Sequence, residues 1–190
     1  MGRWEPDARL RLVSAAVDLF AEQGYDDTTV AEIATRAGLT KATFFRHFRD
    51  KREVLFAGQE AHSAQLAEGV AAAPPGSTPL ELVAAALDSV TASFTAEQRA
   101  FGPRLRAVVA SHDELRERDA FKRAGLVEVL VGALRERGVP DSTARVAAEL
   151  GVEAFHRAFA RWSDDPEAGS YPALARRVLE ELRAAATALT

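Results

Sequence analysis

The chain has 190 residues, of which 47% are hydrophobic and 27% charged, a balance typical of folded globular proteins rather than disordered or fibrous chains. It contains no cysteine, which excludes disulfides, thiolate metal ligands and cysteine nucleophiles. The apolar stretches are too short to span a bilayer, and charged residues interrupt the N-terminal segment, so we expect no membrane partner, no export signal and a cytoplasmic protein.

The formal net charge of −4 conceals a local asymmetry. Residues 36–52 hold six basic residues, with Asp50 as their one acidic residue, which gives this window a net charge of +5 and the rest of the chain −9. A basic patch on an acidic body attracts a polyanion at one place and repels it elsewhere. The alternative is a charged helix face that only contacts water.

Two helices separated by a turn are predicted near the start of the chain. Within Asp7–Gln23, apolar residues recur at three- and four-residue spacing, which indicates an amphipathic helix. Thr29 followed by Glu32 forms a capping box, which predicts the start of a second helix over residues 30–37. Gly38 then supplies a turn.

A third, short helix is predicted over Lys41–His47, with Thr40 as its N-cap. Aromatic side chains are expected to face inward and anchor it. These side chains are Phe44, Phe45 and Phe48.

The rest of the chain is predicted to consist of helices alone, which makes the fold all-α with about nine helices. Asp50 and Glu53 form another cap signature, so a fourth helix is expected to continue to about Val70, before a linker over residues 71–79. We predict an N-terminal three-helix helix-turn-helix domain over residues 1–50 and a helical-bundle regulatory domain over 51–190. Five more helices are expected near 79–95, 97–111, 114–137, 142–163 and 171–189, with breaks around Gly102-Pro103, His112-Asp113, Gly138-Val139-Pro140 and Asp164 to Ser170.

The segment TTVAEIATRAGLTKATFFRHFRDKREVLF closely resembles the signature of the TetR family of transcriptional regulators. In that signature, T-x-x-x-I-A…A-G-(V/L)-(S/T) leads into an aromatic recognition helix and then (S/N/D)-K-x-x-L. The later stretch ELRERDAFKR weakly resembles the mycofactocin-type regulators. The resemblance implies a homodimer that binds a palindromic operator in double-stranded DNA, and a repressor that a small molecule releases.

By the same resemblance, the start of the third helix contacts base edges and its surroundings approach phosphates. Phe45 stands where the family usually has a tyrosine whose hydroxyl binds a phosphate; losing that bond costs about 1 kcal/mol, which Arg46 offsets. For each threonine, the alternative is a plain N-cap. The expected base contacts are Lys41, Ala42 and Thr43, and the expected phosphate contacts are Thr28, Thr29, Thr40, Phe45, Arg46, His47 and Lys51.

The resemblance also implies a dimer surface on the last two long helices and an effector pocket between the middle helices. An apolar pocket lining favours a hydrophobic effector. In both sets, the alternative is the ordinary core of a single chain. The expected dimer residues are Val152, Phe155, Phe159, Trp162, Leu174, Val178, Leu182 and Ala185, and the expected pocket residues are Phe94, Phe101, Leu105, Val108, Val109, Phe121, Val127 and Leu130.

Two other classes of function compete with this interpretation. An enzyme is disfavoured because the four histidines lie far apart and the sequence has no Gly-rich phosphate loop, G-x-S-x-G or H-E-x-x-H motif. We therefore expect no catalytic residue, cofactor or metal site. A helical small-molecule-binding or carrier protein without a DNA role stays open, although it leaves the basic window without a partner.

Overall fold

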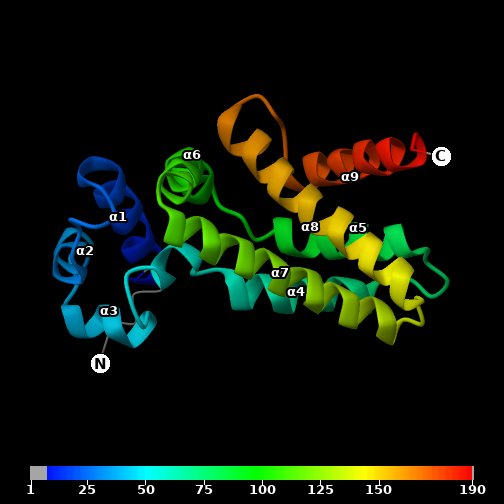
Figure 1. Ribbon diagram of the computed structural model, residues 1–190, viewed down its shortest axis with the longest axis horizontal. Helices are drawn as coiled ribbons and strands as arrows, with labels where there is room; N and C mark the ends of the chain where they lie inside the picture. The colour runs from blue at the N-terminus through cyan, green and yellow to red at the C-terminus, as the bar shows by residue number, and fades with distance from the viewer. Residues whose placement is uncertain (1–7, 190) are drawn as a thin grey trace. The chain divides into compact units, whose positions relative to one another are not determined.

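The computed structural model describes residues 8–189, and in this part of the chain it shows helices and turns with no strand (Figure 1). Nine α-helices and one short 3-10 helix, η1, lie within these residues, which confirms the predicted all-α fold. None of the helices in residues 8–189 is long and apolar enough to cross a membrane. The predicted helix start at Asp7 lies outside the described residues.

The helix bounds follow the sequence prediction closely at the N-terminus and less closely beyond residue 50. The elements are α1 (Ala8–Gln23), α2 (Val30–Arg36), α3 (Lys41–His47), η1 (Glu53–Phe56), α4 (Gln59–Ala72), α5 (Pro79–Thr91), α6 (Ala96–Ser111), α7 (Asp113–Glu136), α8 (Asp141–Asp164) and α9 (Tyr171–Thr187).

Two of the predicted boundaries are wrong. The fourth helix does not run unbroken from Asp50: the chain forms the short η1 and then a turn through Gly58 before α4 begins. In contrast, α6 continues through Pro103, where a break was predicted. Proline removes one backbone donor from a helix, and α6 tolerates that loss.

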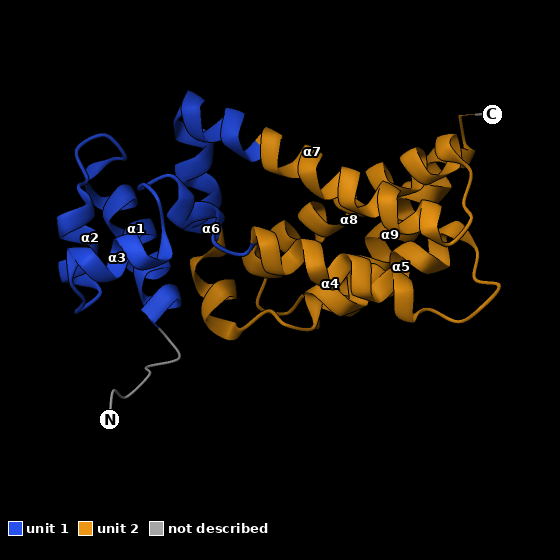
Figure 2. Cartoon of the chain, turned by 90° about the horizontal axis from the view of Figure 1, so that it is seen from below, with its two compact units in different colours: residues 1–58, 103–119 blue, residues 59–102, 120–190 orange. Residues whose placement is uncertain are grey.

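The chain divides into two compact units, coloured separately in Figure 2. Unit 1 comprises residues 1–58 and 103–119, and unit 2 comprises residues 59–102 and 120–190. This division differs from the predicted boundary at residue 50, because η1 belongs with the first three helices. It also adds the end of α6 and the start of α7 to unit 1.

In unit 1, α1 packs against α2 and η1, and α2 packs against α3. Phe44 is fully buried and Phe48 is nearly so, and these two rings anchor α3 as predicted. Phe45 does not face inward: its side chain is 49% exposed, which corrects the prediction of three inward rings. Successive helix positions turn by about 100°, so neighbours such as Phe44 and Phe45 cannot share one buried face unless the helix is enclosed.

In unit 2, α5 lies at the centre and packs against α4, α8 and α9. One continuous cluster of buried aliphatic and aromatic side chains runs through these helices and α7. Packing is close where α8 meets α5: a Cβ added at Gly151 would lie 2.6 Å from Cγ1 of Val83. Glycine is therefore required at this contact.

Candidate nucleic-acid interface

The turn between α2 and α3 sets the position of α3. Thr29 and Glu32 form the predicted capping box at the start of α2. Gly38 adopts φ +67°, a left-handed conformation that glycine accepts at no steric cost. Thr40 then caps α3, because its hydroxyl accepts the backbone N–H of Thr43 at 3.1 Å. Local sequence thus fixes the helix, turn and helix that the spacing predicted.

One face of α3 is exposed along its length. Lys41, Ala42, Phe45 and Arg46 are exposed, whereas Phe44 points into the core of unit 1. Lys41 and Phe45 are four positions apart, as are Ala42 and Arg46, so each pair shares one side of α3, and the two adjacent rows form one broad stripe. This stripe contains two cations, one methyl group and one aromatic ring.

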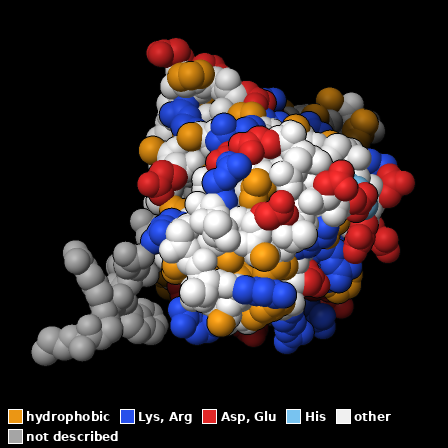
Figure 3. Space-filling model, turned by 90° about the vertical axis from the view of Figure 1, so that its left-hand side faces the viewer, with side chains coloured by type: hydrophobic (Ala, Val, Ile, Leu, Met, Phe, Trp, Pro, Cys, Tyr) orange, Lys and Arg blue, Asp and Glu red, His pale blue; other side chains and the backbone are white. Residues whose placement is uncertain are grey.

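The cations of the basic window fall into two groups. Arg36 forms a bidentate ion pair with Glu22 on α1, with N···O distances of 3.0 and 2.8 Å. Arg52 pairs with Asp50 and Glu114, which also belong to unit 1. Throughout residues 8–189, no ion pair joins Lys41, Arg46 or Arg49 to a carboxylate. These last three therefore carry the charge that is available to a polyanion. Figure 3 shows the surface that lies at the left of Figure 1, where Lys and Arg side chains lie beside hydrophobic ones.

Lys51 is committed to the fold of unit 1. Its ammonium donates to the backbone carbonyls of Tyr25, Asp26 and Thr28 at 2.7, 3.2 and 3.2 Å, and it lies 4.3 Å from the centre of the Tyr25 ring. Burial, with the nearby Glu114 carboxylate, raises the pKa of Tyr25 to about 12. An ammonium has three donors, so these carbonyls use all of them.

Thr28 is only 1% exposed, which contradicts its predicted place on the outer surface. Its hydroxyl donates to the carbonyl of Gly24 at 2.7 Å. The physical reason is the tight turn after α1, which folds this hydroxyl back onto the end of the helix. Thr28 therefore stabilises the turn, and its side chain is not offered to a ligand.

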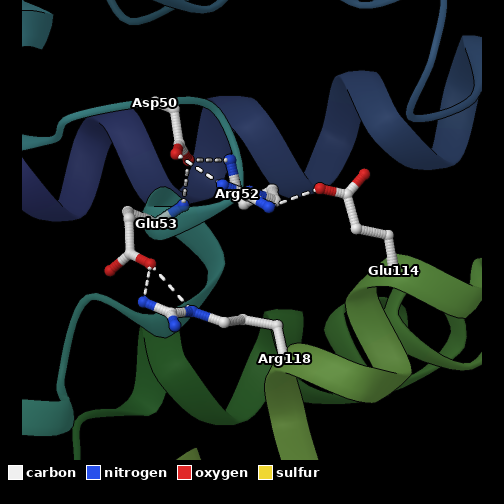
Figure 4. Close-up of polar contacts among 5 residues, drawn as sticks. All are labelled: Asp50, Arg52, Glu53, Glu114 and Arg118. Carbon is white, nitrogen blue, oxygen red and sulfur yellow. Dashed lines mark hydrogen bonds and ion pairs between the residues drawn. The ribbon is translucent and has the colours of Figure 1, made fainter. Parts of the chain in front are cut away.

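The segment after α3 is held by a chain of charges that joins it to the start of α7 (Figure 4). Arg52 pairs with Asp50 at 3.1 Å and with Glu114 at 2.5 Å, and Arg118 donates to Glu53 at 2.9 Å. Asp50 also accepts the backbone N–H groups of Arg52 and Glu53, at 2.9 and 3.0 Å. Burial alone would raise the pKa of Asp50, but these hydrogen bonds lower it. We call these five residues the charge network.

The remaining predicted contacts in the first unit have mixed exposure. Thr43 is half-buried, and its hydroxyl lies 3.0 Å from that of Thr40. Thr29 and Thr40 are exposed, and both serve as N-caps. Burial and the neighbouring Arg46 and Arg9 charges lower the pKa of His47, and its Nε2 is buried without a hydrogen-bond partner in the described residues.

The predicted dimer residues lie mainly in the core of a single chain. Of the eight predicted dimer residues, five are buried in the unit 2 cluster, two are partly buried against it, and one is exposed. For the seven buried or partly buried residues, the alternative of monomer core fits better. The five are Val152, Phe155, Trp162, Leu174 and Val178, the two are Phe159 and Leu182, and the exposed residue is Ala185.

The predicted pocket residues are divided between the two units. Leu105, Val108 and Val109 belong to unit 1, whereas the other five belong to unit 2, where Phe121 is exposed. A groove of about 530 Å³ lies elsewhere in unit 2, between the first turns of α5 and α8, and none of the predicted residues lines it. Its lining residues are Thr78, Pro79, Leu80, Ser142, Thr143, Val146, Ala147 and Leu150.

Sequence reasoning missed two features of these units. The charge network was missed because its members lie more than 60 residues apart, and only the D-x-x-E pattern at Asp50 hinted at it. His62 was also missed: its ring stacks on Phe94 at 5.1 Å, and burial lowers its pKa to about 4. A single histidine in an alanine-rich helix gives no signal of this environment.

Residues 12–57 match the family model described as bacterial regulatory proteins of the tetR family. This segment, about a quarter of the chain, is therefore similar to the tetR family. The match covers α1, α2, α3 and η1, the elements that form and support the exposed face of α3. The matched segment thus coincides with the helix-turn-helix that the sequence predicted.

Among curated proteins, the chain is similar to the HTH-type transcriptional regulator TcmR of Streptomyces glaucescens, with 35% identity over 82 residues. That alignment covers 43% of this chain and 36% of TcmR. The regulator SrpR of Pseudomonas putida is 41% identical over 49 residues, which cover 26% of this chain and 23% of SrpR. The chain therefore aligns with well under half of each of these relatives.

The fold extends over nearly the whole chain in solved structures. The SmeT–triclosan complex covers 94% of this chain and 90% of SmeT, with a TM-score of 0.59 and 20% identity. SmeT is described as the repressor of a Stenotrophomonas maltophilia multidrug efflux pump. FadR of Bacillus subtilis with stearoyl-CoA covers 90% of this chain and 95% of FadR, with a TM-score of 0.53 and 22% identity. At this identity, the likeness establishes the fold.

Proposed function

We propose that this protein is a sequence-specific DNA-binding transcriptional regulator that uses the exposed face of α3. The observation that carries the proposal is the group of three cations, Lys41, Arg46 and Arg49, which have no ion-pair partner in residues 8–189. The major groove of B-DNA admits an α-helix, and phosphates attract unpaired cations. A DNA partner would place the protein in the cytoplasm.

Two copies are expected to bind one palindromic operator, because a single helix-turn-helix contacts only a half-site. Lys41 is suited to donate to guanine O6 or N7, and the Ala42 methyl to pack on an apolar base edge. Arg46 and Arg49 are suited to phosphates. Lys51 and Thr28 leave the set of predicted phosphate contacts, because their polar atoms are already bonded within unit 1.

Selection of bound DNA from a random pool tests this function. We expect the full chain to enrich a palindromic motif, and Lys41→Ala to relax the preference within each half-site. Arg36→Ala is the matched control, because Arg36 is already paired with Glu22 and should leave the motif unchanged. Failure to enrich any motif at low salt would contradict the proposal and favour a small-molecule carrier instead.

We further propose that the protein is a repressor released by a small hydrophobic effector. The support is the largely apolar helical core of unit 2 and the fold that it shares with SmeT and FadR, whose structures contain triclosan and stearoyl-CoA. A ligand that binds only one state of a protein shifts the population toward that state. The test of this proposal is a screen for hydrophobic compounds that both raise the melting temperature of the protein and weaken its binding to the operator. Compounds that bind the protein without weakening its DNA binding would argue against release.

A further inference from the structure

A phenylalanine ring lies half exposed on the same face of α3 as Lys41 and Arg46. Phe45 is 49% exposed, although the two other phenylalanines of this segment are buried. Leaving an aromatic ring in water forgoes the favourable free energy of burying its apolar surface. Such a ring on a predicted binding face is a candidate for burial against the ligand.

The position of the ring is defined by two neighbours. Phe44 contacts it edge to face, with ring centroids 5.6 Å apart and planes at 83°. The ammonium of Lys41, one turn earlier, lies 5.8 Å from its centroid. Residues four apart in a helix are neighbours on its surface, so the ring and the ammonium approach a ligand together.

The other side chains on this face expose smaller apolar groups than Phe45. The hydroxyl of Thr43 lies 3.0 Å from that of Thr40, and Thr43 is half-buried. Ala42 is exposed, but its side chain is a single methyl group. Phe45 is therefore the largest apolar side chain on the exposed face of α3.

We propose that Phe45 is a specificity-determining residue that packs on the C5-methyl group of a thymine in the major groove. This inference rests on the proposed DNA-binding function. A phenyl ring has no hydrogen-bonding atom for a phosphate, and the thymine methyl is the apolar group that the major groove presents. Lys41, held beside the ring, would then donate to a guanine next to that thymine.

Replacement of single thymines in the selected operator tests the contact. Each thymine is changed to deoxyuracil in both half-sites, which removes the methyl and keeps the base pair. Losing one buried methyl is worth about a fourfold change in affinity, or about 15-fold for two half-sites. We expect at least one thymine position at which the dependence seen in the wild type falls below about twofold in Phe45→Ala and is retained in Phe45→Leu and Arg46→Ala.

The outcomes separate this inference from the proposed function. If the protein selects an operator but no deoxyuracil substitution weakens binding, or if Phe45→Ala keeps the full dependence, the inference is wrong and the DNA-binding function stands. If no DNA is selected, both fall. Because Phe45 is half exposed, its variants should keep the wild-type melting temperature, and a matched melting curve for each variant checks this.

Discussion

The guanidinium of Arg52 lies 2.5 Å from the carboxylate of Glu114, 62 residues further along the chain. This pair and the pair between Arg118 and Glu53 hold the segment after α3 against the start of α7 within unit 1. A half-exposed ion pair contributes little to the free energy of unfolding by itself. Removing one partner of a pair that is more shielded from water costs more, because the other charge is left without its partner.

Glu53→Gln should therefore lower the free energy of unfolding by about 1–2 kcal/mol, and Glu114→Gln by about 0.5 kcal/mol, because Glu53 is the less exposed carboxylate. Urea denaturation measures both. Glu180→Gln is the control, because its pair with Arg183, three residues away on α9, is exposed at both side chains. Equal effects at Glu53 and Glu180 would contradict a stabilising role for the charge network.

Lys51 and Arg49 should behave differently although they lie two residues apart. Lys51→Met removes the donor to three carbonyls and should cost about 1–2 kcal/mol of stability, while leaving the salt dependence of DNA binding unchanged. Arg49→Ala should leave the free energy of unfolding unchanged. A plot of the logarithm of the DNA-binding constant against the logarithm of the salt concentration should become less steep, by about 0.9 for each copy of the chain that binds. Fluorescence anisotropy at several salt concentrations gives the slopes. A reduced slope in Lys51→Met would mean that its ammonium does contact phosphate.

These two residues illustrate the limits of the sequence prediction. Charge counting identified the basic window, but it cannot separate a cation that caps a turn from one that faces water. The capped starts of α2 and α3 were predicted correctly because Thr29, Glu32 and Thr40 act within a few residues. Helical periodicity could not distinguish a dimer interface from a core, so Trp162 was assigned to a surface although it is buried.

Stability should fall as the pH is lowered because of His62. Burial lowers its folded-state pKa to about 4, below an unfolded value of about 6.5, so its stabilising contribution is complete above pH 6.5 and is lost as the pH falls toward 4. Between pH 7.5 and 5, the loss from this residue should be about 2 kcal/mol. Urea denaturation of the wild type and of His62→Leu at both pH values measures the part of this loss that comes from His62. The same pH dependence in both proteins would show that His62 is not buried in its neutral form.

Glycine is required where α8 crosses α5. Gly151→Ala should cost about 2 kcal/mol, because the new methyl would overlap Val83. Val83→Ala should relieve part of that cost, so the double variant loses less stability than the sum of the two single variants. Gly132→Ala, on α7 with no atom within 4 Å of the added Cβ, is the control and should stabilise the protein by about 0.5–1 kcal/mol. Strict additivity at positions 83 and 151 would contradict the close packing.

The composition of unit 1 from two separate stretches of chain affects how such a protein can be re-engineered. A chimera made by joining another regulator's first 58 residues to this body would keep residues 103–119 from the host. The transplanted segment would then meet Glu114 and Arg118 without their partners Arg52 and Glu53, unless the donor carries the same charges. Exchange of DNA specificity is therefore better made by substituting the exposed residues of α3 than by exchanging the whole N-terminal segment.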